Sequence, residues 1–430
     1  MGGMLQTLKN AWNIKELRKK LMFTIIMLVV FRVGSHIPVP WLNAEKFRSL
    51  IGQGGQLFGF LDIIAGGAFS NATIFAMSIQ PYINASIIIN LLTVAIPKLE
   101  KLAKEGEEGR KIIAQYTRYG TVILGFLQAT ALYLGMRSAV TPGSPVLSYI
   151  TITLSFTAGT AFLMWLGEQI TEYGIGNGIS ILIFAGIVSR APQAVISFVR
   201  LYIGKAFGTG IFSIITIILI LFVFVVVIAA VIWVQEAERR IPIQYAKRVV
   251  GRKVYGGQNT HLPIKVNLAG VIPIIFAMSI MAFPSTIIGL IAPNSTNKFA
   301  LWLKNAQQSV LYAVLYALLI IFFTFFYTII QFNPVEIANN MKKNGGFIPG
   351  IRPGKPTADY ISKVLNRITW FGGVFLAAIT LLPNLLGIIF KVQGIWFSGT
   401  AMLILVGVAM DTIKQIESYM LMRNYKGFLE

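Results

Sequence analysis

The chain has 430 residues, of which 55% are hydrophobic and 12% charged, and its mean hydropathy is +0.71. A soluble globular chain carries about 25% charged residues, and a disordered chain lacks this much apolar surface, so both classes are excluded. The absence of cysteine excludes a disulfide-stapled secreted domain and any cysteine-ligated metal or iron–sulfur site. The composition indicates an integral membrane protein, and the net charge of +21 fits basic loops that orient it.

The first 20 residues are basic and precede the first apolar run. Leu5, Leu8 and Trp12 share one helical face next to Lys9, which predicts a short helix lying in the membrane interface. A basic stretch before an apolar run is also typical of a secretory signal. No small-residue cleavage site follows, however, so we expect the first apolar run to be retained as a membrane span.

Ten apolar runs approach the length of about 20 residues that a membrane helix needs. In chain order they cover residues 21–39, 72–97, 119–136, 146–167, 175–199, 211–234, 268–292, 310–330, 368–390 and 394–410. The fifth run is ambiguous because Arg190 and Pro192 interrupt it.

The placement of basic residues resolves this ambiguity. Lysine and arginine cluster at residues 1–20, 97–118, 235–267, 331–367 and 414–430. By the positive-inside rule these clusters share the cytoplasmic side, so an even number of spans must separate successive clusters. Between the second and third clusters, that parity requires the fifth run to be a span. The sequence therefore predicts an all-α integral membrane protein with ten transmembrane helices and both termini in the cytoplasm.

Ten helices divide into two halves of five, residues 21–199 and 211–413. An odd number of spans per half reverses the orientation, so any internal duplication would be an inverted repeat. One local match supports a duplication, because residues 74–79 and 275–280 both read IFAMSI. Coincidence between two apolar sequences of low diversity is the alternative.

One apolar segment, residues 57–68, is far too short to cross a bilayer. It lies either on the outer surface or as a re-entrant segment, which requires burial in protein or a water-filled cavity. The next run carries Gln80, Asn84 and Asn90, which mark an inward face, and Pro81 is expected to kink this helix.

Charge inside the predicted spans is rare, and Arg32 is the one clear case. We expect its guanidinium group to reach the interface or to pair within the protein, because an unpaired charge in hydrocarbon is costly.

The two longest cytoplasmic loops, residues 235–267 and 331–367, mix basic side chains with apolar ones. Exposed apolar residues between the charges predict structured protrusions that dock a partner. The basic balance points to an acidic protein surface, ribosomal RNA or anionic lipid. Solvated charge that merely sets the topology is the alternative for many of these residues.

The usual signatures of enzymes are missing. His36 and His261 are far apart, and no nucleophile elbow is present. A phosphate loop at Gly354–Lys355 fails because proline occupies the position of its first glycine, at Pro349. We therefore expect no enzyme, no cofactor and no metal. Ion-coupled transport normally uses acids inside the membrane, and none is deeply placed here, because Glu168 and Asp411 lie near the ends of spans. A secondary transporter and an intramembrane enzyme are therefore weaker alternatives.

Five stretches of the chain resemble the SecY family, the large channel-forming subunits of the bacterial Sec protein translocase. They are QPYINASIIINLL (80–92), GEQITEYGIGNGIS (167–180), residues 239–265, NLAGVIPIIFA (267–277) and GGFIPGIRPGKPTADYI (345–361). Together they spread over most of the chain. The resemblance implies an hourglass pore between two inverted halves of five helices, which opens sideways to lipid.

The resemblance also implies specific site residues. Residues 57–68 resemble the family's plug, a short helix that blocks the outer funnel, with Leu57, Phe58, Phe60, Leu61, Asp62, Ile63 and Ile64. The positions that match the family's apolar constriction are Ile79, Ile83, Ile179, Ile183, Ile275 and Ile404. The first four form two i,i+4 pairs, so each pair shares a helix face. Lipid-facing isoleucine is the alternative.

Further residues follow from the same resemblance. Asn90 and Gln128 match polar positions near the lateral gate. The positions that resemble docking residues for a motor or ribosome are Arg239, Arg240, Lys247, Arg252, Lys253 and Arg352. The implied partners are the small subunits SecE and SecG, the ATPase motor SecA, the ribosome, preproteins with signal sequences, and membrane lipid. The implied location is the cell membrane.

Overall fold

The computed structural model describes most of the chain. The described residues are 12–53, 62–141, 143–193, 195–196, 211–245, 248–250, 253–255, 259–291, 309–390 and 399–426. They form two compact units, each of which is discontinuous in sequence.

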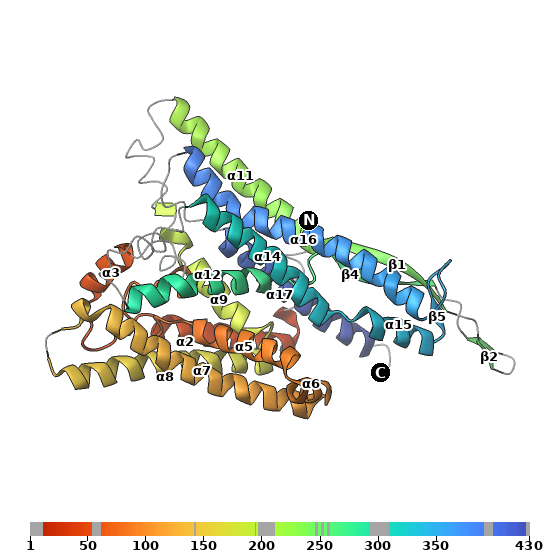
Figure 1. The fold of residues 1–430 in the computed structure, drawn as a ribbon, viewed down its shortest axis with the longest axis horizontal. Helices are drawn as coiled ribbons and strands as arrows, with labels where there is room; N and C mark the ends of the chain where they lie inside the picture. The colour runs from red at the N-terminus through yellow and green to blue at the C-terminus, as the bar shows by residue number, and fades with distance from the viewer. Residues whose placement is uncertain are drawn as a thin grey trace. The chain divides into compact units, whose positions relative to one another are not determined.

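The first unit contains helices from both ends of the chain (Figure 1). Its elements are α2 (Lys15–Gly34), α3 (Ala44–Gln53), α5 (Gln80–Ala95), α6 (Pro97–Lys104), α7 (Glu107–Gly135), the 3₁₀ helix Arg137–Ala139, α8 (Pro145–Tyr173), α9 (Gly178–Ser189) and α17 (Gly399–Lys426). Helix α8 packs against α7, α2 and α9, while α17 packs against α9.

The second unit contains the remaining helices and all five described strands. Its elements are α11 (Ile211–Glu236), β1 (Glu238–Tyr245), β2 (Arg248–Val250), β3 (Lys253–Tyr255), β4 (Asn259–Lys265), the start of α12 (Ile272–Ile291), α14 (Val310–Gln331), α15 (Pro334–Lys343), β5 (Gly346–Phe347) and α16 (Lys355–Phe390). Helix α16 packs against α14 and α15.

Each of the ten predicted spans overlaps one described helix. By length and composition, four described helices can cross a bilayer, namely Pro145–Tyr173, Val310–Lys343, Lys355–Pro383 and Gly399–Leu421. The pair α5 and α6 adds a fifth if it is counted as one span broken by a 102° bend. Shorter apolar helices are described at Gly178–Gln193, Leu221–Glu236 and Ile272–Met281.

Several predicted boundaries are wrong for identifiable reasons. The second span was expected from residue 72, but residues 74–79 form turns and the helix begins at Gln80. Pro81 therefore lies in the first helical turn, where proline is well tolerated, and does not kink the helix. The sharp bend follows Ala95 instead, where Pro97 begins α6. The first IFAMSI copy is thus non-helical while the second lies in α12, so this match does not support a duplication.

The N-terminal break also differs from its prediction. A separate interfacial helix was expected to end at residue 20, but α2 runs without interruption from Lys15 to Gly34. No glycine or proline separates the basic stretch from the apolar run, so nothing in the sequence stops the helix there. The break lies at Ile14, and residues 1–11 are outside the described part of the chain.

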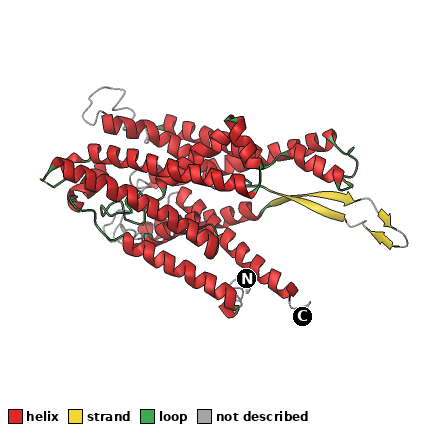
Figure 2. Cartoon of the chain, turned by 90° about the horizontal axis from the view of Figure 1, so that it is seen from below, coloured by secondary structure: helices red, strands yellow, loops and turns green. Residues whose placement is uncertain are grey.

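The expected protrusion at residues 235–267 is a β-ribbon, so the chain is mostly helical rather than wholly so (Figure 2). Strand β1 pairs antiparallel with β4, from Glu238 opposite Lys265 to Gln244 opposite Asn259. On its other edge β1 pairs with β5, which comes from the second predicted loop. The two predicted loops therefore share one three-stranded sheet.

A small hydrophobic core fixes this sheet to the helices of the second unit. Its buried residues are Ile241, Ile243, Ile264, Met341, Ile348, Ile361 and Leu365. The alternating burial of β1 places Ile241 and Ile243 on the covered face and Pro242 on the exposed face. Because α16 begins at Lys355, 13 residues before the predicted span, its first turns provide two of the core residues.

Candidate functional site

A turn segment, residues 62–79, leads into α5 and follows the short apolar segment singled out in the sequence. Residues 62–64 form one helical stretch, and turns with one isolated bridge at Thr73 follow as far as Ile79. Ile64, Ala65 and Ala68 expose 4%, 0% and 0% of their surface. Burial of this kind favours a re-entrant position over an outer-surface loop.

Two glycines on neighbouring helices let the backbone of the turn segment approach closely. A Cβ on Gly186 of α9 would lie 2.1 Å from the carbonyl oxygen of Ile64, and one on Gly159 of α8 would lie 2.0 Å from that of Ile74. No side chain fits either position without displacing backbone. Within the turn itself, Gly66 has a φ of +63°, a conformation that favours glycine.

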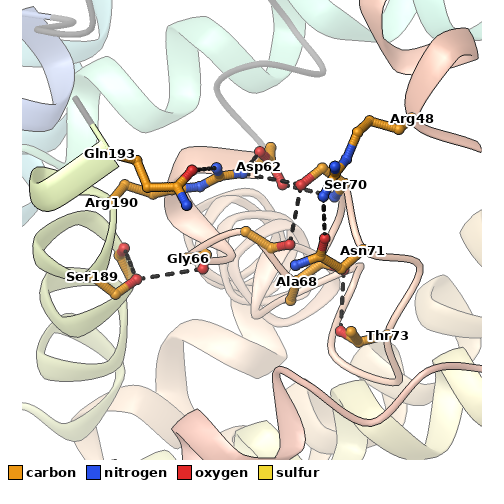
Figure 3. A network of polar contacts seen from close by, with 12 residues as sticks. Arg48, Asp62, Gly66, Ala68, Ser70, Asn71, Thr73, Ser189, Arg190 and Gln193 are labelled. Carbon is orange, nitrogen blue, oxygen red and sulfur yellow. Dashed lines mark hydrogen bonds and ion pairs between the residues drawn. The ribbon is translucent and has the colours of Figure 1, made fainter. Parts of the chain in front are cut away.

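Polar side chains tie the turn segment to the end of α9 (Figure 3). Arg190 forms an ion pair with Asp62 and donates a hydrogen bond from Nη2 to Ser70 Oγ at 3.1 Å. Asp62 Oδ1 also accepts the backbone N–H of Ser70 at 2.7 Å. Ser189 Oγ donates to the carbonyl oxygen of Gly186 at 2.8 Å and lies 3.4 Å from that of Gly66.

Two further arginines contact the same segment. Arg32 of α2 donates from Nη1 to the Gly66 carbonyl oxygen at 2.9 Å and to Ser189 Oγ at 3.2 Å. The expectation that Arg32 pairs within the protein is therefore confirmed. Arg48 of α3 donates from Nη2 to Asn71 Oδ1 at 2.6 Å.

The sequence predicted Arg190 only as an interruption of a span, and it did not predict the polar cluster that Arg190 forms with Asp62 and Ser70. One signal was available: Asp62 and Arg190 are single charges of opposite sign, each in an otherwise apolar stretch. Of the expected plug residues, Asp62, Ile63 and Ile64 belong to the turn segment. The others, Leu57, Phe58, Phe60 and Leu61, lie outside the described residues.

The six isoleucines expected at the constriction fall in both units. Ile79, Ile83, Ile183 and Ile404 belong to the first unit and expose 1%, 9%, 5% and 1% of their surface. The lipid-facing alternative is thereby excluded for these four. Ile179 of α9 is half-buried and packs against Gly167 of α8. Ile275 of α12 belongs to the second unit and is half-buried there.

The two polar residues expected near the lateral gate lie on adjacent helices of the first unit. Asn90 is exposed on α5, and its Nδ2 donates to Ser86 Oγ at 3.5 Å. Gln128 is half-buried on α7, which packs against α5. Nothing in their geometry joins them directly.

Of the expected docking residues, Arg239 and Arg240 lie in β1 of the shared sheet, and Arg352 follows β5 in the chain. Arg239, Arg240 and Arg352 are exposed, and Arg240 Nε contacts Glu238 Oε1 at 2.7 Å. Exposed ion pairs of this kind contribute little to stability, so the arginines remain available to a partner. Lys247 and Arg252 lie outside the described residues, and only the backbone of Lys253, in β3, is described.

In the part of the chain that the structure describes, no group of three or more histidine, aspartate or glutamate side chains could hold a metal ion. The features that remain are buried branched apolar residues, a buried turn segment and an exposed basic sheet.

Comparisons with known proteins decide the family. The SecY family model matches residues 73–413. The chain is 48% identical over 443 residues to the protein translocase subunit SecY of Halalkalibacterium halodurans, covering 99% of this chain and 100% of that protein. The chain belongs to the SecY family. The SecY of Thermotoga maritima is also 48% identical, over 99% of this chain and 98% of that protein.

Solved structures support the same fold for this SecY-family chain. The structure of a protein-conducting channel matches with a TM-score of 0.66 at 20% identity, covering 93% of this chain and 92% of that one. Sec61 in a canine ribosome–channel complex from the endoplasmic reticulum matches with a TM-score of 0.61 at 18% identity and the same coverage. The prediction of a multi-pass membrane channel subunit is confirmed, with a mostly helical fold where an all-α one was expected. The transporter and enzyme alternatives are excluded.

Proposed function

We propose that this chain forms the protein-conducting channel of a Sec translocase, through which unfolded secretory polypeptides cross the membrane. The observation that carries the proposal is the 48% identity to SecY over nearly the whole of both chains. The pore lies between two inverted halves, residues 21–199 and 211–413, and the chain supplies the conduit rather than the energy.

The waist of the pore is a ring formed by the six isoleucines named above. Branched aliphatic side chains offer no hydrogen bonds to a passing polypeptide, so they do not retain it. A narrow ring of such groups also resists ions, because water leaves a tight apolar constriction. The burial of Ile79, Ile83, Ile183 and Ile404 supports this role.

The residues expected as the plug cover the outer side of this ring in the resting channel. Support comes from the described end of the plug, since Ile64, Ala65 and Ala68 are buried against the protein. A plug held inside the molecule closes the pore without a separate partner.

Apolar segments of a client leave sideways between the helices that carry Asn90 and Gln128 and those of the other half. Partition into lipid is favourable by a few tenths of a kcal/mol per leucine or isoleucine and is opposed by about 3 kcal/mol per charge. A lateral opening lets each segment sample this balance, so sufficiently apolar segments remain in the membrane.

The work of transport comes from a partner that binds the shared cytoplasmic sheet. SecA or a translating ribosome would contact Arg239, Arg240, Lys247, Arg252, Lys253 and Arg352. One of the solved structures similar to this chain is itself a channel bound to a ribosome. SecE and SecG complete the complex in the cell membrane, with both termini of the chain in the cytoplasm.

The absence of cysteine allows a direct test of the pore. Ile83→Cys is introduced into the full chain, and a secretory polypeptide carrying one cysteine is stalled midway through the purified, membrane-embedded complex. Oxidation is expected to crosslink the two chains. The matched control is Ile123→Cys on α7, whose side chain is 61% exposed and expected to face lipid.

Crosslinking at residue 83 and its absence at residue 123 support the pore. If the stalled polypeptide crosslinks only at residue 123, the polypeptide does not pass the isoleucine ring and the proposed function is wrong. Several stalled lengths place the client cysteine at different depths, so a single misplaced register does not decide the result.

A further inference from the structure

The ion pair between Asp62 and Arg190 is largely shielded from water. The two side chains expose only 13% and 19% of their surface. It joins residues 128 positions apart in the sequence, and Ser70 closes the arrangement by contacting both partners. Figure 3 shows Arg190 reaching from the end of α9 to Asp62 and Ser70. We name Asp62, Ser70 and Arg190 the clasp.

The clasp continues the helix face that carries part of the proposed ring. Ile179, Ile183, Gly186 and Arg190 follow one another at intervals of four, three and four residues, which places them on one face of α9 and its C-cap. Gly186 on this face receives the backbone of Ile64, and Arg190 holds the side chain of Asp62. The turn segment is therefore fixed at the end of the face that begins with the isoleucines.

The negative charge of Asp62 is needed to compensate the positive charges that surround the clasp. The three guanidinium groups of Arg32, Arg48 and Arg190 contact the turn segment or its neighbours, and Asp62 is the one carboxylate among the clasp and these contacts. Removal of a partner from a shielded pair leaves an uncompensated charge, which is far more damaging than loss of an exposed pair. Loss of Asp62 would leave three like charges beside one short segment.

We propose that the Asp62–Arg190 clasp holds the turn segment, and with it the end of the plug, in the closed position of the resting channel. The inference rests on the proposed function, because it assigns the regulation of that same pore. Arg190 acts as a positioning residue: it touches the plug segment and not the transported polypeptide. Opening requires Asp62 to exchange Arg190 for water or another partner.

The test measures ion leak through the resting channel. The full chain is purified with its associated subunits and reconstituted into vesicles, and iodide influx is read by quenching of an entrapped dye. Asp62→Asn and Arg190→Gln are expected to raise the leak roughly tenfold or more, which corresponds to about 1.4 kcal/mol. Asp62→Asn should leak more, because it leaves the arginines unopposed.

Three variants separate the clasp from general damage. Arg190→Lys keeps the charge and should restore most of the closure. The double variant Asp62→Asn with Arg190→Gln should leak less than the two single effects combined, because both remove one interaction. Arg118→Gln breaks a different interhelical pair, Arg118 Nε to Glu168 Oε1 at 2.8 Å, and should leave the leak unchanged.

The proposal is overturned if both single variants leak within twofold of the wild-type channel, or if Arg118→Gln leaks as much as they do. Failure of the proposed function is recognised separately, because the wild-type chain would then give no crosslink at residue 83. If the channel crosslinks normally at residue 83 and loss of Asp62 does not change its ion leak, the proposal for the clasp is wrong while the proposed function stands.

Discussion

Replacement of Ile241 by alanine should loosen both of the loops that form the shared sheet, residues 235–267 and 331–367. Ile241 exposes 1% of its surface, lies in β1 and belongs to the core that joins the sheet to α15 and α16. The substitution removes three carbon atoms, about 0.8 kcal/mol each, so the transfer loss is about 2.4 kcal/mol. The cavity left behind adds to this, and buried isoleucine-to-alanine changes cost about 2–5 kcal/mol in total.

Hydrogen exchange of the strand amides measures this loss locally. At 1.4 kcal/mol per factor of ten, the transfer loss of about 2.4 kcal/mol predicts exchange about 50-fold faster. The acceleration should include the pairing of β1 with β4 and the pairing of Gln244 with Phe347 in β5. The control is His261→Ala, since His261 is exposed opposite Pro242 on the other face of the sheet.

The prediction that the three strands open together would be refuted if the amides of β4 and β5 responded differently. If β4 amides exchange faster while those of Gly346 and Phe347 keep wild-type rates, the two loops open independently and do not form one docking surface. Equal acceleration by His261→Ala would show that the effect does not come from the buried core.

Two further predictions concern the start of α9. Thr24→Val should lower the free energy of unfolding by about 1–3 kcal/mol, because Thr24 Oγ1 accepts the buried N–H of Ile175 at 3.1 Å. Thermal unfolding of the purified complex measures this loss. An equal loss in Thr24→Ser, which keeps the hydroxyl group, would contradict the hydrogen-bond explanation. Asn177→Ala should lower the free energy of unfolding by about 1 kcal/mol, because Asn177 Oδ1 caps α9 by accepting the N–H of Ser180 at 3.2 Å. Asn177→Ser should retain most of the stability in the same assay. An alanine variant as stable as the wild type would contradict the role of Asn177 as the helix cap.

Helix placement was predictable because hydrophobic length and charge parity are local or additive properties of the sequence. The parity of the basic clusters was enough to identify α9, whose apolar run is interrupted by Arg190. Boundaries failed where the chain is apolar but not helical. Residues 74–79 are as hydrophobic as a span, yet they form turns. The carbonyl oxygen of Ile74 approaches Gly159 closely in this segment, and no local pattern reports such a contact.

Part of the candidate site could likewise be predicted from the sequence, and part could not. The buried isoleucines were found through motifs that resemble a known family, since their spacing alone does not distinguish a pore from a core. The Asp62–Arg190 pair was missed because its partners lie 128 residues apart and no sequence pattern connects the plug segment with the end of the fifth span. The shared sheet was expected only as protrusions, because pairing of β1 with β5 depends on contacts between two separate loops.

The last helix completes a unit that the first helices begin. Leu17, Ile175 and Ile416 form one buried cluster, and Lys20 Nζ lies 4.5 Å from the ring centroid of Tyr419. About 210 residues separate the end of α9 from the start of α17, which corresponds to roughly 10–40 s of ribosomal synthesis at 5–20 residues per second. During that interval Leu17 and Ile175 lack their partner Ile416, so the growing chain leaves uncovered an apolar surface that α17 buries when its synthesis is complete.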